Sequence, residues 1–242
     1  MSCDDRITVR GHDLATEIIG QMTFTELLLL DVRGELPGPA EVRVVDAVLV
    51  ALMEHGLTPS SVVTRLALDA APESLQGAMS AGMLAVGSRF LGVIEDVARL
   101  LQGVVADAGD EGPEVAARTH VQRLLAGGHR VPGFGHNLFA ESDPRVEALL
   151  GVARHEGVAG PHTNALPFVR DAVAAALRRP IPINTTGAVG AILSDLGNPP
   201  EIVRGFALVA RCAGLLAHVA DERRLPLGRT FWEQLRDVRT TE

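Results

Sequence analysis

Helical periodicity is the feature that most constrains the fold of this chain. Apolar side chains recur every three to four positions in one segment after another, whereas the alternation typical of strands is weak throughout. Glycine and proline separate these segments, for example at Gly56, Pro72 and Pro180. Only Ile7 to Val9 favours a short strand. The pattern predicts an all-α fold of about ten to twelve helices.

The predicted helices cover most of the sequence. Pro39 stands where a first-turn proline fits, just before the broad apolar stripe of Ala40–Glu54. Some segments, such as the stretch from Gly82 to Leu101, have little polar face. Helices of that kind are buried or pair across a subunit interface, which favours an oligomer. The predicted helices are Phe24–Val32, Ala40–Glu54, Ser60–Asp69, Ser74–Val86, Phe90–Val105, Glu114–Leu125, Arg145–His155, Thr163–Arg178, Ala188–Leu196, Pro200–Arg223 and Phe231–Val238.

Composition and charge limit the class of protein. The chain has 242 residues, of which 47% are hydrophobic and 21% charged, so it is long and apolar enough to bury a sizeable core. Its net charge of −8 argues against a nucleic-acid or anionic-membrane surface. The two cysteines, Cys3 and Cys212, lie far apart in sequence, which argues against a disulfide framework and fits a reducing cytoplasm. Because no signal-peptide pattern or long uninterrupted apolar run is present, we expect a cytoplasmic protein without a membrane span.

A stiff turn precedes His136. The run Val131-Pro132-Gly133-Phe134-Gly135-His136 is followed, after six residues, by Asp143-Pro144-Arg145. Glycine lets the backbone approach a ligand closely, and histidine changes charge near neutral pH. Arg145 offers a rigid fork for a carboxylate. The segment therefore predicts an active-site loop for a small organic acid.

Other candidates are less constrained by their local sequence. His55 ends a long apolar helix, where the helix terminus favours the imidazolium; a cap role and a catalytic role both explain it. Arg65, Arg145 and Arg211 lie in apolar surroundings, where a charge needs either a carboxylate partner or a ligand. Both possibilities stay open for each arginine.

The remaining histidines fit structural roles. We expect His12, His120, His129 and His155 at the surface and His162 at a helix start, while His218 suits a structural hydrogen bond or catalysis equally. No histidine, cysteine or carboxylate group has the spacing of metal ligands, so no metal site is predicted.

Six sequence blocks lie in a recognisable order. They are RITVRGHDL with FTELLLLDVRGELP, Glu54-His55-Gly56 through Arg65, SLQGAMSAGMLAVGSRFLG, VPGFGHNLFAESDPR, INTTGAVGAILSDLGNPPEI and GFALVARCAGLLAHVADE. Taken together, the chain resembles the citrate synthase superfamily, and within it the short citryl-CoA lyase branch that includes the C-terminal module of ATP-citrate lyase.

This resemblance implies an architecture and a reaction. The fold would be an all-α homodimer with a large domain, residues 1–90 and 198–242, and a smaller closing domain, residues 91–197. The reaction would join or split a carbon–carbon bond between an acyl-CoA and a 2-oxo acid such as oxaloacetate. The substrates would be a di- or tricarboxylate and a coenzyme A thioester, with no bound cofactor.

The resemblance also assigns site residues. His136 matches the histidine at the oxo-acid carbonyl, and His55 matches the histidine that hydrogen-bonds the oxo acid. Arg145 and Arg211 match carboxylate-binding arginines, and Arg229 matches the arginine that the neighbouring subunit contributes. The backbone of Val131, Pro132, Gly133, Phe134 and Gly135 would contact coenzyme A.

Three departures from the family pattern fall on the acyl-CoA side of the expected site. Phe90 replaces a histidine of the synthases, as it does in the lyase module of ATP-citrate lyase. Thr186 replaces the acid/base aspartate, so it could hold a water or donate a hydrogen bond. The run 137–141, with Ala140 and Glu141, lacks the basic residue that helps to hold coenzyme A phosphates. Asp69 and Asp195, the candidates for a displaced base, have the pattern of ordinary helix-surface acids.

Three functions follow from this pattern. The leading hypothesis is citryl-CoA lyase-like cleavage or the reverse condensation. A second is a decarboxylating condensation or hydrolysis of another thioester, since decarboxylation makes an enolate without a base. A third is a carboxylate-binding homologue that has lost its chemistry at Thr186.

Overall fold

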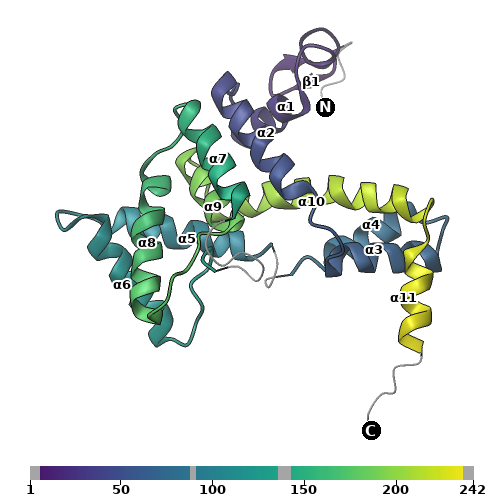
Figure 1. Ribbon diagram of the computed structural model, residues 1–242. Helices are drawn as coiled ribbons and strands as arrows, with labels where there is room; N and C mark the ends of the chain where they lie inside the picture. Colours follow the sequence, from purple (N-terminus) through teal and green to yellow (C-terminus); the bar gives the residue numbers. More distant parts are fainter. Residues whose placement is uncertain (1–5, 88–90, 136–142, 237–242) are drawn as a thin grey trace.

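The structure is a computed structural model that describes residues 6–87, 91–135 and 143–236. Within these ranges its regular secondary structure is helical apart from one two-stranded hairpin, which confirms the all-α prediction (Figure 1). The elements are β1 (Thr8–Val9), β2 (His12–Asp13), a π-helical turn η1 (Leu14–Ile18), α1 (Phe24–Arg33), α2 (Pro39–Met53), α3 (Pro59–Ala70), α4 (Leu75–Leu84), α5 (Val93–Ala106), α6 (Gly112–Ala126), α7 (Pro144–His155), α8 (Pro161–Leu177), α9 (Thr185–Asp195), α10 (Pro200–Glu222) and α11 (Leu227–Arg236).

Local sequence signals explain why the helices begin near the predicted positions. At α1, the Thr23 hydroxyl accepts a hydrogen bond from the Glu26 amide at 3.2 Å, and the Glu26 carboxylate accepts one from the Thr23 amide at 2.6 Å. At α7, Asp143 caps the helix and Pro144 occupies its first turn. The predicted strand is also present, because Val9 pairs with His12 in a short antiparallel hairpin.

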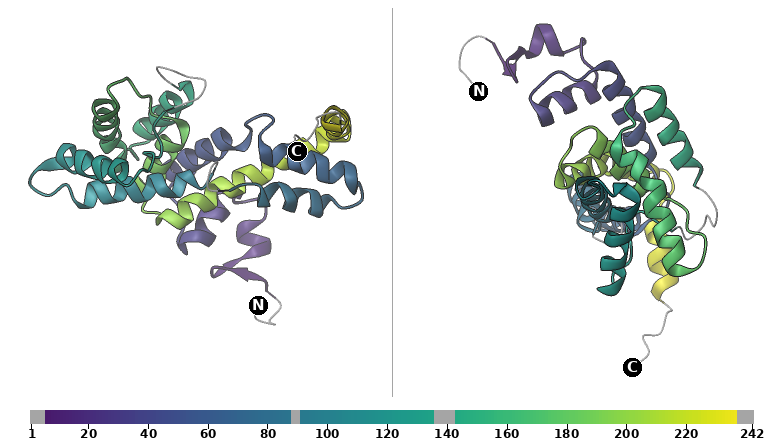
Figure 2. Two further views of the ribbon diagram at one scale, coloured as in Figure 1. Left: turned by 90° about the horizontal axis from the view of Figure 1, so that it is seen from below. Right: turned by 90° about the vertical axis from the view of Figure 1, so that its left-hand side faces the viewer.

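Helix α10 crosses the molecule and packs against α2, α3, α4, α5 and α9. In Figures 1 and 2 it runs from α5 and α9 at one end to α3 and α4 at the other. Its buried side chains include Phe206, Ala210 and Leu215. By length and composition alone α10 could span a membrane, but 50% of its apolar window is buried, as in the core helix of a folded protein.

Three apolar clusters hold the helices together. The largest joins α2, α5, α7, α9 and α10 around residues such as Val48, Ile94 and Ile192. The second joins α5, α6, α8 and α9, and a small third cluster lies between α3, α4 and α10. Helix α9 is buried along its whole length, with Ile192 in the first cluster and Ala191 in the second. The division into two domains stays a prediction.

Asp195 is a buried helix cap, so its prediction as a helix-surface acid was wrong. Its side chain is only 1% exposed and accepts hydrogen bonds from the amides of Gly160, His162 and Thr163 at 2.8–3.0 Å, and from the His162 ring at 2.8 Å. Burial alone would raise the pKa of Asp195, but these hydrogen bonds lower it overall. The carboxylate thus satisfies the first amides of α8, which have no partner within the helix.

We expect Asp195→Ala to lower the free energy of unfolding by about 3 kcal/mol, because it leaves several buried donors without an acceptor. Asp171→Ala is the matched control, since Asp171 also belongs to α8 but its side chain is 65% exposed; its loss should stay below about 0.5 kcal/mol. Urea unfolding measures both. Equal effects of the two substitutions would contradict the capping role.

Candidate active site

Three residues predicted for the site line one pocket. The pocket has a volume of about 110 Å³ and lies where the ends of α2, α3 and α4 meet α9 and α10. His55, Thr186 and Arg211 come from distant parts of the sequence and share its wall. The other lining residues are Leu52, Thr58, Pro59, Ser60, Ala85, Val86 and Leu91.

Arg211 is a buried cation. It is only 3% exposed, and its Nη1 atom lies buried without a hydrogen-bond partner among the described residues. Burial lowers the pKa of its guanidinium, which the negative charge of Glu54 opposes. A buried charge of this kind is costly unless something compensates it. Since no carboxylate in the described ranges forms an ion pair with Arg211, the structure favours the ligand-binding role that the sequence left open.

His55 lies just beyond the end of α2. Its Nδ1 atom is also buried without a hydrogen-bond partner in the described part of the chain. Burial lowers the pKa of its imidazole, and the positive charges of Arg211 and Arg145 lower it further, against the opposing charge of Glu54. The expectation that the helix terminus favours an imidazolium was therefore wrong, because burial of the ring, together with two arginines from other helices, outweighs it. At neutral pH the ring presents a neutral nitrogen to the pocket.

Arg145 is oriented by Asp143. Its Nε donates to Asp143 Oδ1 at 3.0 Å and its Nη2 donates to Oδ2 at 2.8 Å, while the Thr185 hydroxyl donates to the same carboxylate at 2.7 Å. Burial alone would raise the pKa of Asp143, but these hydrogen bonds lower it to about 2. Asp143 therefore stays ionised and ties Arg145 to the start of α9, where Thr186 follows Thr185.

The loop before His136 packs against the same helix start. Gly133 has a φ of +85°, and a Cβ there would lie 2.8 Å from Val97 Cγ2 and 3.0 Å from the Gly187 Cα. Only glycine fits this position. The Asn184 side-chain amide donates to the Gly135 carbonyl at 2.8 Å, and the Asn184 backbone amide donates to the Gly133 carbonyl at 3.1 Å. This contact holds Val131 to Gly135 beside Thr186.

The Thr186 hydroxyl has a partner of its own. It donates to Asn184 Oδ1 at 2.6 Å, and the same oxygen caps α9 by accepting from the Gly187 amide at 3.1 Å. The hydroxyl is thus used as a donor, as the sequence allowed, and its oxygen keeps lone pairs to accept from a water or a substrate.

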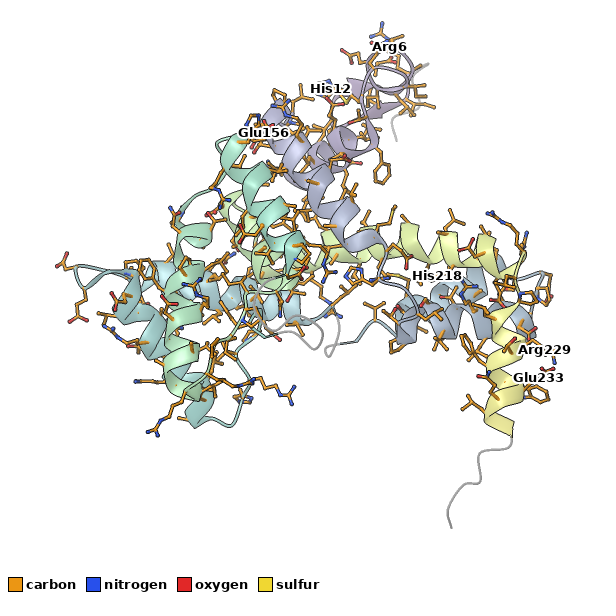
Figure 3. All side chains as sticks on the ribbon, viewed as in Figure 1. Arg6, His12, Glu156, His218, Arg229 and Glu233 are labelled. Atoms are coloured by element: carbon orange, nitrogen blue, oxygen red, sulfur yellow. The ribbon has the colours of Figure 1, made fainter. Side chains whose placement is uncertain are left out.

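Arg229 lies away from the pocket of its own chain. It stands on α11, pairs with Asp69 at 3.4 Å between Nη2 and Oδ2, and lies over the Trp232 ring (Figure 3). Helix α3 begins at the pocket with Ser60 and ends near Asp69; at 1.5 Å per residue this puts Arg229 roughly 14 Å away. Asp69 is therefore an ion-pair partner. The predicted residues His136, Phe90 and Ala140 lie outside the described residues.

The sequence analysis did not predict a series of hydrogen-bonded polar side chains next to His55. The Glu54 carboxylate accepts from the His55 amide at 2.9 Å, and it meets His218 Nε2 at 3.2 Å. Arg65 in turn donates to His218 Nδ1 at 3.2 Å and to Glu222 at 2.8 Å. His218 thus has the structural hydrogen bonds foreseen for it, and Arg65 has the carboxylate partner that was one of its two predicted options.

Two hydroxyls in the pocket were also missed. Thr58 Oγ1 and Ser60 Oγ lie 3.0 Å apart, and Ser60 is buried. The signal was present, since both residues belong to the block from Glu54 to Arg65 that carries the resemblance. Among the described residues, no group of three or more histidine, cysteine, aspartate or glutamate side chains could hold a metal ion.

The family model described as the C-terminal domain of citrate synthase matches residues 6–230. The chain belongs to the citrate synthase family. An ATP-citrate synthase beta chain of Arabidopsis thaliana is 28% identical over 211 residues, which cover 80% of this chain and 34% of the relative. A relative from Mycobacterium tuberculosis, provisionally named citrate synthase 2, is 28% identical over 219 residues, or 84% of this chain and 53% of the relative. The chain spans about half the length, or less, of these curated family members.

Solved structures of the family share the fold. The citryl-CoA lyase of Hydrogenobacter thermophilus has a TM-score of 0.86 and 30% identity, and the match covers 98% of this chain and 90% of that one. The ATP citrate lyase of Methanosaeta concilii, solved with (3S)-citryl-CoA, has a TM-score of 0.82 and 21% identity over 41% of its length. The second likeness shows the fold alone.

His55→Asn should change how stability depends on pH. The pKa of His55 lies below its ordinary value of 6.5 in the folded protein, so the unfolded chain binds more protons in that window and wild-type stability falls as the pH falls through it. Relative to His55→Asn, wild type should therefore lose stability between about pH 7.5 and pH 5.5. Urea unfolding at both pH values measures this, and His155→Asn controls for loss of an exposed imidazole. A relative gain by wild type at low pH would contradict a neutral His55.

Proposed function

We propose that this chain is a citryl-CoA lyase-type enzyme, which cleaves, or in reverse forms, a carbon–carbon bond between an acyl-CoA and a 2-oxo acid such as oxaloacetate. The observation that carries the proposal is the convergence on one pocket of His55 and Arg211, each with a buried nitrogen that has no hydrogen-bond partner among the described residues. The likeness to a citryl-CoA lyase at 30% identity, over nearly the full length of both chains, supports it.

The charges in the pocket suit an oxo acid with carboxylates. Arg211 would pair with one carboxylate, which would compensate its buried charge. The positive charge of Arg145, oriented by Asp143, would attract a second carboxylate. The neutral His55 ring would hydrogen-bond the substrate oxygen through its free nitrogen. A substrate of this class supplies the partners that the described protein atoms lack.

Cleavage would begin at the substrate hydroxyl. His136, the proton acceptor predicted from the sequence, would take the hydroxyl proton, and the oxygen electrons would form the carbonyl of the oxo acid. The carbon–carbon bond would break, and its electron pair would move to the thioester as an enolate. A water would then return a proton to the enolate carbon. Thr186, which stands in place of the acid/base aspartate, could hold that water by its hydroxyl oxygen.

Thr186 also supports a second candidate. A protein that binds di- or tricarboxylates without turning over thioesters would keep His55 and Arg211 and tolerate the loss of the acid/base aspartate. It would be stabilised against heat by citrate or oxaloacetate, since a ligand that binds only the folded state raises the melting temperature. Decarboxylating use of a malonyl-type thioester would instead make an enolate without any base.

Incubation of the purified protein with citryl-CoA should release oxaloacetate, which a malate dehydrogenase assay detects. Arg211→Leu should lower kcat/KM by about 100-fold, because it removes charge-assisted hydrogen bonds to the substrate. Arg154→Leu, at an exposed position on α7, is the control. If wild type releases oxaloacetate no faster than His136→Ala does, the lyase function is rejected. Turnover of a malonyl thioester would favour the decarboxylating reaction. Heat stabilisation by citrate without turnover would favour the carboxylate-binding protein.

We also propose that the enzyme acts as a homodimer. Large apolar side chains are exposed among the described residues, including Leu84 at 87%, Phe24 at 71% and Val50 at 64%. Exposed apolar side chains of this size suit an interface with a second copy of the chain. In such a dimer Arg229, remote from its own pocket, would complete the site of the partner.

Light scattering should give a dimer mass for the wild type and a monomer mass for Leu84→Glu. If Arg229 acts across the interface, Arg229→Ala and Arg211→Leu should each be inactive alone. Mixed, dissociated and reassembled in equal amounts, they should regain about a quarter of the wild-type activity, because half of the dimers then hold one intact site. If mixed dimers of confirmed mass regain no activity, a site shared between the two subunits is excluded.

A further inference from the structure

A second, larger pocket lies beside the segment from Val131 to Gly135, which we call the glycine loop. It has a volume of about 530 Å³, within the range of ligand sites, and lies between α5, α6 and the segment that leads to Pro132. Three arginines and two histidines line it: Arg99, Arg123, Arg130, His120 and His129. Since the whole chain carries a net charge of −8, three arginines in one pocket stand out.

The arginines of this pocket are only partly compensated. Neither Arg123 nor Arg130 forms an ion pair with any carboxylate in the described ranges, whereas Arg99 donates to Glu95 at 2.6 Å. Asp96 is the single acidic residue in the lining. The pocket therefore keeps a positive excess and suits an anion.

The glycine loop connects this cationic pocket to the candidate active site. Pro132 lines the cationic pocket, and the next residue, Gly133, packs against Gly187. Gly187 directly follows Thr186, which lines the active-site pocket. A ligand that follows Val131 to Gly135 would therefore have one end among the arginines and the other beside Thr186. Such a ligand is long, with an anionic end and a reactive end.

We propose that this cationic pocket binds the nucleotide phosphates of coenzyme A, with Arg123 and Arg130 as the principal contacts. The choice of coenzyme A rests on the proposed function. Guanidinium groups bind phosphate oxygens through paired hydrogen bonds, and all 22 basic residues of this chain are arginines. The run 137–141 has no basic residue, so these arginines would replace the phosphate-binding cation absent from it.

Isothermal titration with coenzyme A itself tests the proposal without requiring turnover. The double variant Arg123→Ala/Arg130→Ala should raise the Kd about 100-fold, since each lost charge-assisted contact is worth a factor of about 10. Arg118→Ala is the matched control, because Arg118 also lies on α6 but pairs with Glu114 and does not line the pocket. Wild type should also lose affinity when 3′-dephospho-CoA replaces coenzyme A.

Kinetic measurements distinguish binding in this pocket from the chemical reaction. With citryl-CoA, the double variant should show a raised KM and an unchanged kcat, and with a citryl-pantetheine thioester, which lacks the nucleotide, it should match wild type. Wild-type affinity for coenzyme A in the double variant would overturn the proposal and leave the lyase function intact. Arginine-dependent binding of coenzyme A without any turnover would support the pocket and reject the lyase. Equal, arginine-dependent binding of ATP would assign the pocket to a free nucleotide and overturn the choice of coenzyme A.

Discussion

The packing of α10 against five other helices is the interaction on which the rest of the structure depends. Its apolar face joins the helices of the largest core cluster to the separate group of α3 and α4 (Figure 1). Arg211 and His218 lie on the buried face of this helix, so both side chains are desolvated. It carries Arg211 into the active-site pocket and His218 into contact with Glu54. The same packing that holds the fold together therefore creates the electrostatics of the site.

The site combines one fully used carboxylate with one unused cation. The Asp143 carboxylate accepts hydrogen bonds from Arg145 and Thr185, so it holds the Arg145 side chain in place and is not available as a base. Arg211 and His55, by contrast, hold buried nitrogens that no described atom satisfies. This asymmetry suits a site that binds an anionic substrate firmly.

Much of this could be predicted from the sequence, because helix periodicity, caps and turns are local. The stripe of Ala40–Glu54 became α2 at Pro39–Met53. The motif order grouped His55, Thr186 and Arg211, and these three residues line one pocket. The errors concern distant neighbours. Asp195 looked exposed on its own helix, but the start of α8 covers it. The helix end at His55 favoured a cation, but burial of the ring and the charges of Arg211 and Arg145 reverse that preference.

The sequence by itself determined the helices, the family and the residue types available for chemistry, since these follow from local pattern and motif order. Only the tertiary structure decided which charges are compensated. Arg65 and Arg211 both lie in apolar helical sequence, yet Arg65 meets Glu222 while Arg211 meets no carboxylate in the described chain. The reason is physical: desolvation and Coulomb interactions depend on distances through space, which helical periodicity along a chain does not encode.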